Sequence, residues 1–460
     1  MSDSQKGEKA TYVVSPDYAG MDYDVEAGII DDTDTCSSPT AAPLPAVKLG
    51  AQIGEADQEE FPEGGRGWLV VAGTSCALNT GFGMVNAFGI YMTYYGQEMF
   101  PNTSSSTMSL IGGLQVSVVY FSSIPVRMLI NKLGVQPVLA IGGFLIVLSL
   151  MMTSISTQVW HLFLAQGVTF GLGAGCCYLP AVSVPSEYFK KKRALALGVT
   201  AAGSSVGGVI WPIAIKRLLV SVGFAWTNRI IGFIFIPVLV FMVWATKPRL
   251  AHSKQQVSFE LLKNWRFLVL CAAQMVGMFG VFPALFYVDT YGERLGNLPP
   301  SILNYSVAIL NASSVLGRIG PAYLADRVGR LNVLTPFVCL TGLFPLVFWL
   351  PSRGESLFVL FLVLWGIASG CFISMFPSCV GQLFGVKHTL SGIALLNMAG
   401  APGSLAGGAI GGKFLPLPDV AQGIEGFTGL IVFSGVVMLV SSLILLSLRL
   451  SISFKPTAFI

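Results

Sequence analysis

The clearest shortage in this sequence is of charge. Only 11% of its 460 residues are Asp, Glu, Lys or Arg, whereas a soluble protein carries about 25%. Hydrophobic residues make up 53% of the chain, and the mean hydropathy is +0.71. So little charge excludes a disordered chain, a nucleic-acid-binding protein and an ordinary soluble enzyme. The composition instead predicts a polytopic membrane protein whose main surroundings are the lipid bilayer.

Acidic residues are scarce in the body of the chain. Of the 23 Asp and Glu residues, 14 precede residue 67, whereas residues 67–460 hold 9 acids against 23 Lys and Arg. The first 66 residues are acidic and rich in Ser, Pro and Gly, and they lack the apolar core of a cleavable signal. We expect this segment to be a disordered tail. We expect the basic excess of the body to lie in short loops between membrane spans, where it sets topology and does not indicate nucleic acid.

The sequence also lacks the motifs of enzyme and metal chemistry. It has three His and eight Cys, without any CxxC or Cys/His spacing that would hold a metal. Seven of the cysteines fall in apolar stretches, where a thiol behaves as a small hydrophobic group. No P-loop, HExxH or GxSxG pattern occurs. These absences predict a protein that is not an enzyme, does not hydrolyse ATP and needs neither cofactor nor metal.

What the chain does contain is a series of long apolar runs. A membrane-spanning helix needs about 20 mostly apolar residues, and we find twelve candidates: 68–95, 108–130, 137–157, 160–186, 194–215, 225–246, 266–288, 301–324, 332–351, 357–384, 389–413 and 427–448. The predicted fold class is therefore all-α integral membrane. Its predicted parts are an acidic cytoplasmic tail (1–66), a six-helix bundle (67–246), a cytoplasmic linker (247–265), a second six-helix bundle (266–450) and a cytoplasmic tail (451–460). We expect a monomer.

Positive charge is divided unequally between the two sides of the predicted membrane. Twelve spans place 20 Lys and Arg on the side of both termini and 6 on the opposite side, with Arg318 inside a span. Because cytoplasmic loops are enriched in Lys and Arg, both termini are predicted to be cytoplasmic. The protein is then a multi-pass protein of the cell membrane. The first outer loop carries the sequon Asn102-Thr103-Ser104, so Asn102 is a predicted glycosylation site.

Three short patterns recur in the two halves of the chain. GLGAGC at 171–176 recurs as GIASGC at 366–371, GSSVGG at 203–208 recurs as GSLAGG at 403–408, and NKLG at 131–134 has a counterpart in DRVG at 326–329. Six spans per half give both halves the same orientation in the membrane, so the repeats are predicted to be parallel. This is the layout of major facilitator transporters, which hold their substrate near the midplane between the halves.

The segment YLADRVGR at 323–330 ends the eighth predicted span. It resembles the loop signature of the major facilitator superfamily, whose D-R-x-G-R core controls closure at the cytoplasmic side. The resemblance implies that Asp326, Arg327, Gly329 and Arg330 form a conformational gate. An ordinary turn with arginines reaching toward the interface is the alternative interpretation.

Two further segments resemble one family within that superfamily. EGGRGWLVV at 63–71 is similar to the acidic-Gly-Gly-aromatic-Gly-Trp motif before the first span of monocarboxylate transporters, with Arg66 in the aromatic position. The segment 178–198 looks like the connection between spans four and five of fungal members. The resemblance extends over about residues 67–450. It implies a secondary active transporter, similar to fungal monocarboxylate permeases, that moves a small organic acid or related metabolite by alternating access.

Arg318 carries most of the functional prediction. A permanent cation inside a span costs about 2.5–3.5 kcal/mol on insertion scales, so it must face the bundle interior or a water-filled path. Its planar fork suits a carboxylate, although backbone carbonyls are alternative partners. It matches the span-eight arginine that is thought to hold the substrate anion in monocarboxylate transporters. That family's Asp four residues earlier is Ser314 here, and its span-one lysine is Asn86, so proton-coupled lactate transport is not implied.

Several polar residues at mid-depth complete the predicted substrate site. With Arg318, they are Asn86, Gln115, Tyr120, Asn311, Ser314 and Asn397. Each can serve instead as a hydrogen bond between helices. Three functions remain open at this point: a carrier of an organic acid, an efflux carrier of a neutral or bulky secondary metabolite, and a nutrient receptor that no longer transports. The receptor would need a long cytoplasmic signalling extension, and a 66-residue tail is modest for that role.

Overall fold

A computed structural model describes residues 64–189, 192–249, 259–296, 298–385, 389–415 and 424–454. Within these ranges the chain is helical and contains no strand. The predicted tail lies outside the described residues except for 64–66, and the middle of the predicted linker, 250–258, lies outside them too. The domain boundaries therefore stay predictions, but the fold class can be tested on the helices.

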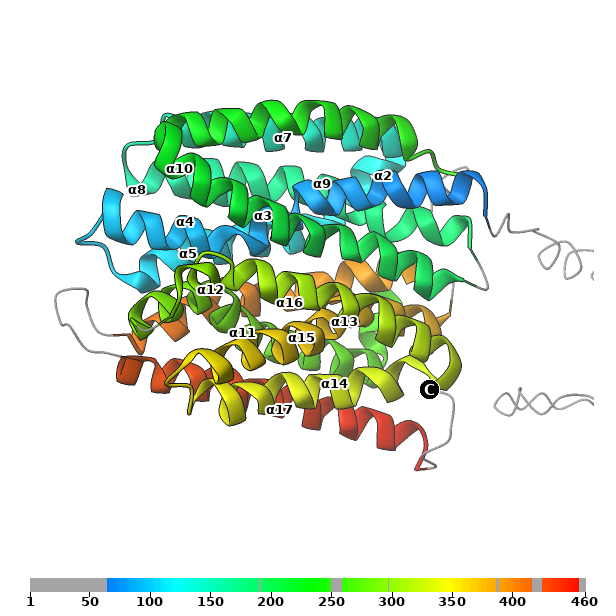
Figure 1. Ribbon diagram of the computed structural model, residues 1–460. Coiled ribbons are helices and arrows are strands. Elements are labelled where there is room, and N and C mark those ends of the chain that lie inside the picture. Colours follow the sequence, from blue (N-terminus) through cyan, green and yellow to red (C-terminus); the bar gives the residue numbers. More distant parts are fainter. Residues whose placement is uncertain are drawn as a thin grey trace, which may run out of the picture. The chain divides into compact units, whose positions relative to one another are not determined.

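Among the described residues, the first half of the chain contains nine α-helices, which Figure 1 colours from blue to green. They are α2 (Arg66–Thr80), α3 (Phe82–Asn86), α4 (Phe88–Tyr94), α5 (Ser105–Phe121), α6 (Ser123–Leu133), α7 (Val135–Ser154), α8 (Val159–Leu162), α9 (Phe170–Ser183) and α10 (Arg193–Ala245). Short breaks at Gly81 and Ala87 divide the first span into α2, α3 and α4. At Gly223 the backbone of α10 takes a positive φ of 77°, which only glycine adopts readily. α10 is therefore two spans that meet at this turn.

The described part of the second half contains seven α-helices, drawn from green through yellow to red in Figure 1. They are α11 (Trp265–Leu295), α12 (Pro300–Leu303), α13 (Ser306–Val328), α14 (Arg330–Phe344), α15 (Glu355–Phe384), α16 (Thr389–Lys413) and α17 (Thr428–Ile452). Large apolar side chains on the outer surface, such as Phe144, Val240 and Leu443, are about two-thirds exposed. Such exposure is typical of a surface that contacts lipid.

The twelve predicted spans can be traced through these helices. Within the described ranges, nine helical segments are long and apolar enough to cross a membrane, and the α5–α6 pair, bent by 46°, makes a tenth. The turn at Gly223 divides one of the nine into two spans. α13 is 23 residues long but less apolar, because it carries Arg318 and other polar groups. Counting that helix completes the twelve.

The repeated glycines pack in the same way in both halves. A Cβ at Gly171 or Gly175 of α9 would meet the carbonyls of Gln115 and Val119 on α5. The matching positions Gly366 and Gly370 on α15 would meet the carbonyls of Leu310 and Ser314 on α13, and every one of these residues is displaced by 195. Gly203 and Gly207 face Ser75 and Asn79, just as Gly403 and Gly407 face Met275 and Phe279, each displaced by 200. This equivalence confirms the parallel repeats.

The repeat packing predicts a paired effect of substitution. Gly203→Ala and Gly403→Ala each place a methyl group against a backbone carbonyl of the neighbouring helix. Because backbone cannot yield as a flexible side chain does, each change should destabilise the fold by about 1–3 kcal/mol. Gly320→Ala is the control, since that position faces open space and alanine favours the helix. In detergent, the thermal unfolding midpoints of Gly203→Ala and Gly403→Ala should be lower than that of wild type. The midpoint of Gly320→Ala should be unchanged or higher.

Candidate functional site

Arg318 lies inside the bundle, between the two halves. Its side chain comes from α13 and is only 3% exposed. Its Nη1 donates to the carbonyl of Ala201 (2.7 Å) and to the hydroxyl of Ser204, both on α10 of the first half, and its Nε donates to Ser314 Oγ at 3.3 Å. Nη2 makes no hydrogen bond to any described residue. The two ion pairs found among those residues lie elsewhere, so this buried cation faces no carboxylate there.

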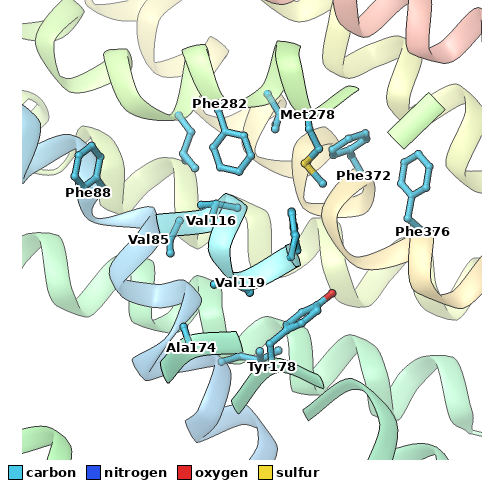
Figure 2. Packing of buried hydrophobic residues seen from close by; sticks show 14 of the residues in the cluster. Val85, Phe88, Val116, Val119, Ala174, Tyr178, Met278, Phe282, Phe372 and Phe376 are labelled. Atoms are coloured by element: carbon cyan, nitrogen blue, oxygen red, sulfur yellow. The ribbon is translucent and has the colours of Figure 1, made fainter. Parts of the chain in front are cut away.

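Arg318 borders a small cavity of about 40 Å³ at the junction of the halves. The first half contributes Phe82, Tyr120 and Tyr178, and the second contributes Arg318, Ile373, Ser374 and Pro377. Small-molecule sites usually measure about 300–1,000 Å³. In this conformation the cavity is too small for a metabolite, so the halves must separate for one to bind. Figure 2 shows the buried apolar side chains of the two halves, including Phe88 and Phe282, on either side of their junction.

Four of the seven predicted substrate residues converge near this cavity. Tyr120 and Arg318 line it, and Ser314 accepts a hydrogen bond from Arg318. Asn86 donates through Nδ2 to the carbonyl of Ser204 at 3.2 Å. The hydroxyl of the same Ser204 accepts a hydrogen bond from Arg318. These four residues come from α3, α5 and α13, so the site draws on both repeats.

The other three predicted residues are buried but do not line the cavity. Asn311 donates to the carbonyl of Val307 in its own helix (2.9 Å) and packs against Gly208. This arrangement matches the alternative role of helix packing. Gln115 Oε1 and Asn397 Nδ2 are buried and have no hydrogen-bond partner among the described residues. Their role in binding stays a prediction.

Sequence reasoning did not single out Phe82, Tyr178 or Ser204 as site residues. Ser204 lies in the small-residue pattern 203–208, which indicated helix packing and not an anchor for a cation. Phe82 and Tyr178 are ordinary aromatic residues in apolar runs, and only the fold brings them together. Their rings lie 5.1 Å apart, and each lies 6.2 Å from the ring of Tyr120.

The predicted gate residues connect three helices of the second half. Gly329 ends α13 with a φ of 106°, and its N–H donates to the carbonyl of Ala325 at 3.0 Å. Its counterpart Gly134 ends α6 with a φ of 86° and bonds to Ile130, the residue 195 positions before Ala325. The third repeated pattern is therefore also structurally equivalent in the two halves.

Arg330 fixes this loop to α15. It forms an ion pair with Asp326 (3.8 Å) and donates to the carbonyl of Ser378 at 2.7 Å. Arg327 instead lies over the ring of Tyr323, 4.3 Å from its centroid. Arg193, at the start of α10, lies near enough to Arg330 for repulsion between the halves. The role of this motif as a gate stays a prediction.

Polar contacts seal the opposite end of the junction, which is the predicted outer end. Lys216 on α10 forms an ion pair with Asp289 on α11 at 2.8 Å, and Asp289 is fully buried. Gln97 donates to Glu293 at 2.8 Å, and the hydroxyls of Thr93 and Thr290 lie 3.2 Å apart. Each contact joins the first half to the second. We call Lys216, Asp289, Gln97 and Glu293 the outer seal.

Asn102 provides a test of membrane orientation. It is exposed in the turn between residues 99 and 105, and its neighbour Thr103 lines a pocket together with Gln97 and Glu293 of the outer seal. If this end faces outward, the full-length protein expressed in a eukaryotic host should carry a glycan there. Treatment with an N-glycosidase should then speed its migration on a gel, and Asn102→Gln should remove the difference. A wild-type protein that migrates identically with and without treatment would count against the predicted orientation.

Two parallel helical repeats around a buried central site define a secondary transporter that works by alternating access. The comparisons assign the family: residues 69–408 match the Major Facilitator Superfamily, and the chain belongs to this superfamily of transporters. It is 34% identical to the aspyridones efflux protein apdF of Emericella nidulans, over 82% of this chain and 79% of the relative. It is 35% identical to the agnestins efflux protein AgnL12 of Paecilomyces divaricatus, over 84% and 88%.

Other matches agree on the superfamily and on the fold. MFS-type transporter 1 of an Ophiocordyceps species is 31% identical over 86% of this chain and 88% of its own length. The crystal structure of the peptide transporter POT in complex with sulfate aligns with a TM-score of 0.65 at 14% identity, over 85% and 97% of the two chains. These findings confirm the predicted fold class. Two of the relatives named here are efflux proteins and the name of the third states no substrate, so the narrower assignment to monocarboxylate permeases does not follow from them.

Proposed function

We propose that this transporter exports an acidic secondary metabolite from the cytoplasm across the cell membrane, as a monomer with both termini inside. The names of relatives that cover most of the chain support export, since two are efflux proteins for such metabolites. The acidic character of the substrate is supported by Arg318. An organic acid also agrees with the resemblance to monocarboxylate carriers, although the substrate is expected to be larger than lactate.

The single observation that carries the proposal is a buried guanidinium that pairs with no carboxylate of the described residues. A charge removed from water is stabilised only when it is paired and fully hydrogen-bonded. Arg318 has three neutral acceptors on two of its nitrogens, and Nη2 has none among the described residues. An acid in the cavity would supply the missing negative charge and accept two parallel hydrogen bonds.

The geometry suggests how binding is linked to movement of the halves. Arg318 joins α13 to α10 through Ala201 and Ser204. A bound carboxylate would compete for the same N–H groups and weaken this connection. Since the outer seal is closed, the acid would enter from the cytoplasmic end. Rocking of the halves would then break the seal and release the acid outside.

Transport into inside-out vesicles tests the proposal. Vesicles containing the full-length protein should accumulate radiolabelled 6-methylsalicylate faster than vesicles without the protein. This probe is chosen because it is an aromatic carboxylic acid. Unlabelled acids should compete, and their methyl esters should compete weakly. Running the assay with and without an imposed proton gradient also reveals the coupling ion. Equal competition by acids and esters would contradict an acid-specific exporter.

A further inference from the structure

The three aromatic side chains that line the cavity all come from the first half. Phe82 begins α3, Tyr120 lies near the end of α5 and Tyr178 lies on α9. The three ring centroids form a triangle with sides of 5.1, 6.2 and 6.2 Å. All three residues line the cavity together with Arg318. We call Phe82, Tyr120 and Tyr178 the aromatic wall.

The aromatic wall differs from an aromatic cluster that serves only packing. In the second half, Phe361 and Trp349 stack at 4.8 Å with an interplanar angle of 18°, both are fully buried, and neither lines the central cavity. The rings of the aromatic wall are inclined to one another by 38–64°, and Phe82 is only partly buried. Because all three rings of the aromatic wall border the cavity, a ligand there can contact them, whereas it cannot reach Phe361 or Trp349.

The second half lines the cavity with groups that contain no aromatic ring. They are Arg318, Ile373, Ser374, Pro377 and Ser378. The guanidinium of Arg318 supplies the positive charge in this part of the lining. Its Nη2, which makes no hydrogen bond to a described residue, provides hydrogen-bond donors for a ligand. The hydroxyl of Tyr120 likewise makes no hydrogen bond to a described residue. A ligand that contacts both Arg318 and the aromatic wall needs an acidic group at one end and a flat apolar surface at the other.

We propose that the substrate is a planar aromatic or conjugated acid that bridges the two halves. Its ring system packs against Phe82, Tyr120 and Tyr178 of the first half, and its acidic oxygen accepts hydrogen bonds from Arg318 of the second. This inference rests on the proposed function, because it deepens the acid site by assigning the class of carbon skeleton. Saturated acids of the same size lose the ring contacts and bind more weakly.

A matched pair of acids tests the aromatic wall. The full-length protein in lipid nanodiscs is titrated at neutral pH with 2-naphthoate and with trans-decahydro-2-naphthoate, which have the same carboxylate and carbon framework but differ in planarity. Aromatic contacts add to the burial of apolar area, so wild-type protein should bind 2-naphthoate about tenfold more tightly. Phe82→Leu should reduce this ratio to about twofold, while Tyr120→Phe, which keeps the ring, should preserve it.

The control variant is Phe361→Leu, which removes a buried ring of the same size away from the cavity and should leave the ratio unchanged. If wild-type protein binds the two acids equally and Arg318→Ala binds neither, the proposed role of the aromatic wall is wrong but the acid site is supported. A ratio that persists in Phe82→Leu and Tyr178→Leu would also overturn it. Binding that is insensitive to Arg318→Ala, or absent for both acids, would overturn the acid site itself. Equal wild-type binding of the two acids overturns the aromatic wall even if every variant fails to fold.

Discussion

Arg318→Ala is expected to lower kcat/KM for export of an acid by about 100-fold or more. A hydrogen bond to a charged group contributes about 1.5–3 kcal/mol, and 1.36 kcal/mol corresponds to a factor of ten. Loss of two such bonds therefore removes most of the recognition. Arg318→Lys should be intermediate, because it keeps the charge but loses the planar fork that binds a carboxylate at two points. Initial rates of uptake into inside-out vesicles measure both effects.

The matched control for Arg318 is Arg229→Ala. Arg229 also lies in a spanning helix, but it donates to Ser154 within the first half and does not line the cavity. Its loss should leave kcat/KM within about threefold of wild type, since its hydrogen bond lies away from the cavity and makes no contact with the transported acid. Comparable losses in both variants would show that general damage to the bundle, and not loss of acid binding, explains the phenotype.

Lys216→Ala is expected to open the outer seal. Asp289 would be left fully buried and charged without its partner, and breaking a buried pair in this way costs about 3–5 kcal/mol. Only the conformation with the outer end closed bears that cost, so the equilibrium should shift toward the outward-open form by about 100-fold or more. A cysteine at Thr290, where the halves meet, should then react much faster with a membrane-impermeant maleimide applied outside.

Two further variants decide whether loss of the Lys216–Asp289 ion pair causes the faster labelling. Adding Asp289→Asn to Lys216→Ala removes the stranded charge and should slow labelling back toward the wild-type rate. Arg217→Ala removes an exposed hydrogen bond to Tyr305 and should have little effect. The same protein without the Thr290 cysteine gives the background from the native thiols. Unchanged labelling in Lys216→Ala would mean that the seal does not depend on this ion pair.

Much of the fold could be predicted because bilayer physics constrains local sequence. Long apolar runs gave the spans, and the repeated glycines at 171 and 366 or 203 and 403 gave the relation between the halves. Glycine is required at these positions by close contact with a carbonyl, so its spacing carries structural information. Arg318 could be placed inside the bundle because its exposure to lipid would be costly.

The rest of the site depended on contacts between distant segments. Lys216 and Asp289 are 73 residues apart and belong to different halves, so no local pattern connects them. The guanidinium of Arg318 is held by Ser204, which lies 114 residues away in a stripe of small residues. Phe82 and Tyr178 could not be distinguished by sequence from aromatic residues that face lipid. Pairing across the two halves is a property of the assembled bundle.

Competition between an acid and its methyl ester tests the central claim most directly. The claim is that Arg318 holds a negatively charged group of the substrate between the two halves. In wild-type nanodiscs, 2-naphthoate should bind at least about tenfold more tightly than methyl 2-naphthoate, because only the acid forms charge-assisted hydrogen bonds with the guanidinium. In Arg318→Ala the two ligands should bind alike. A preference for the acid that survives in Arg318→Ala, or no preference in wild-type protein, would contradict the account.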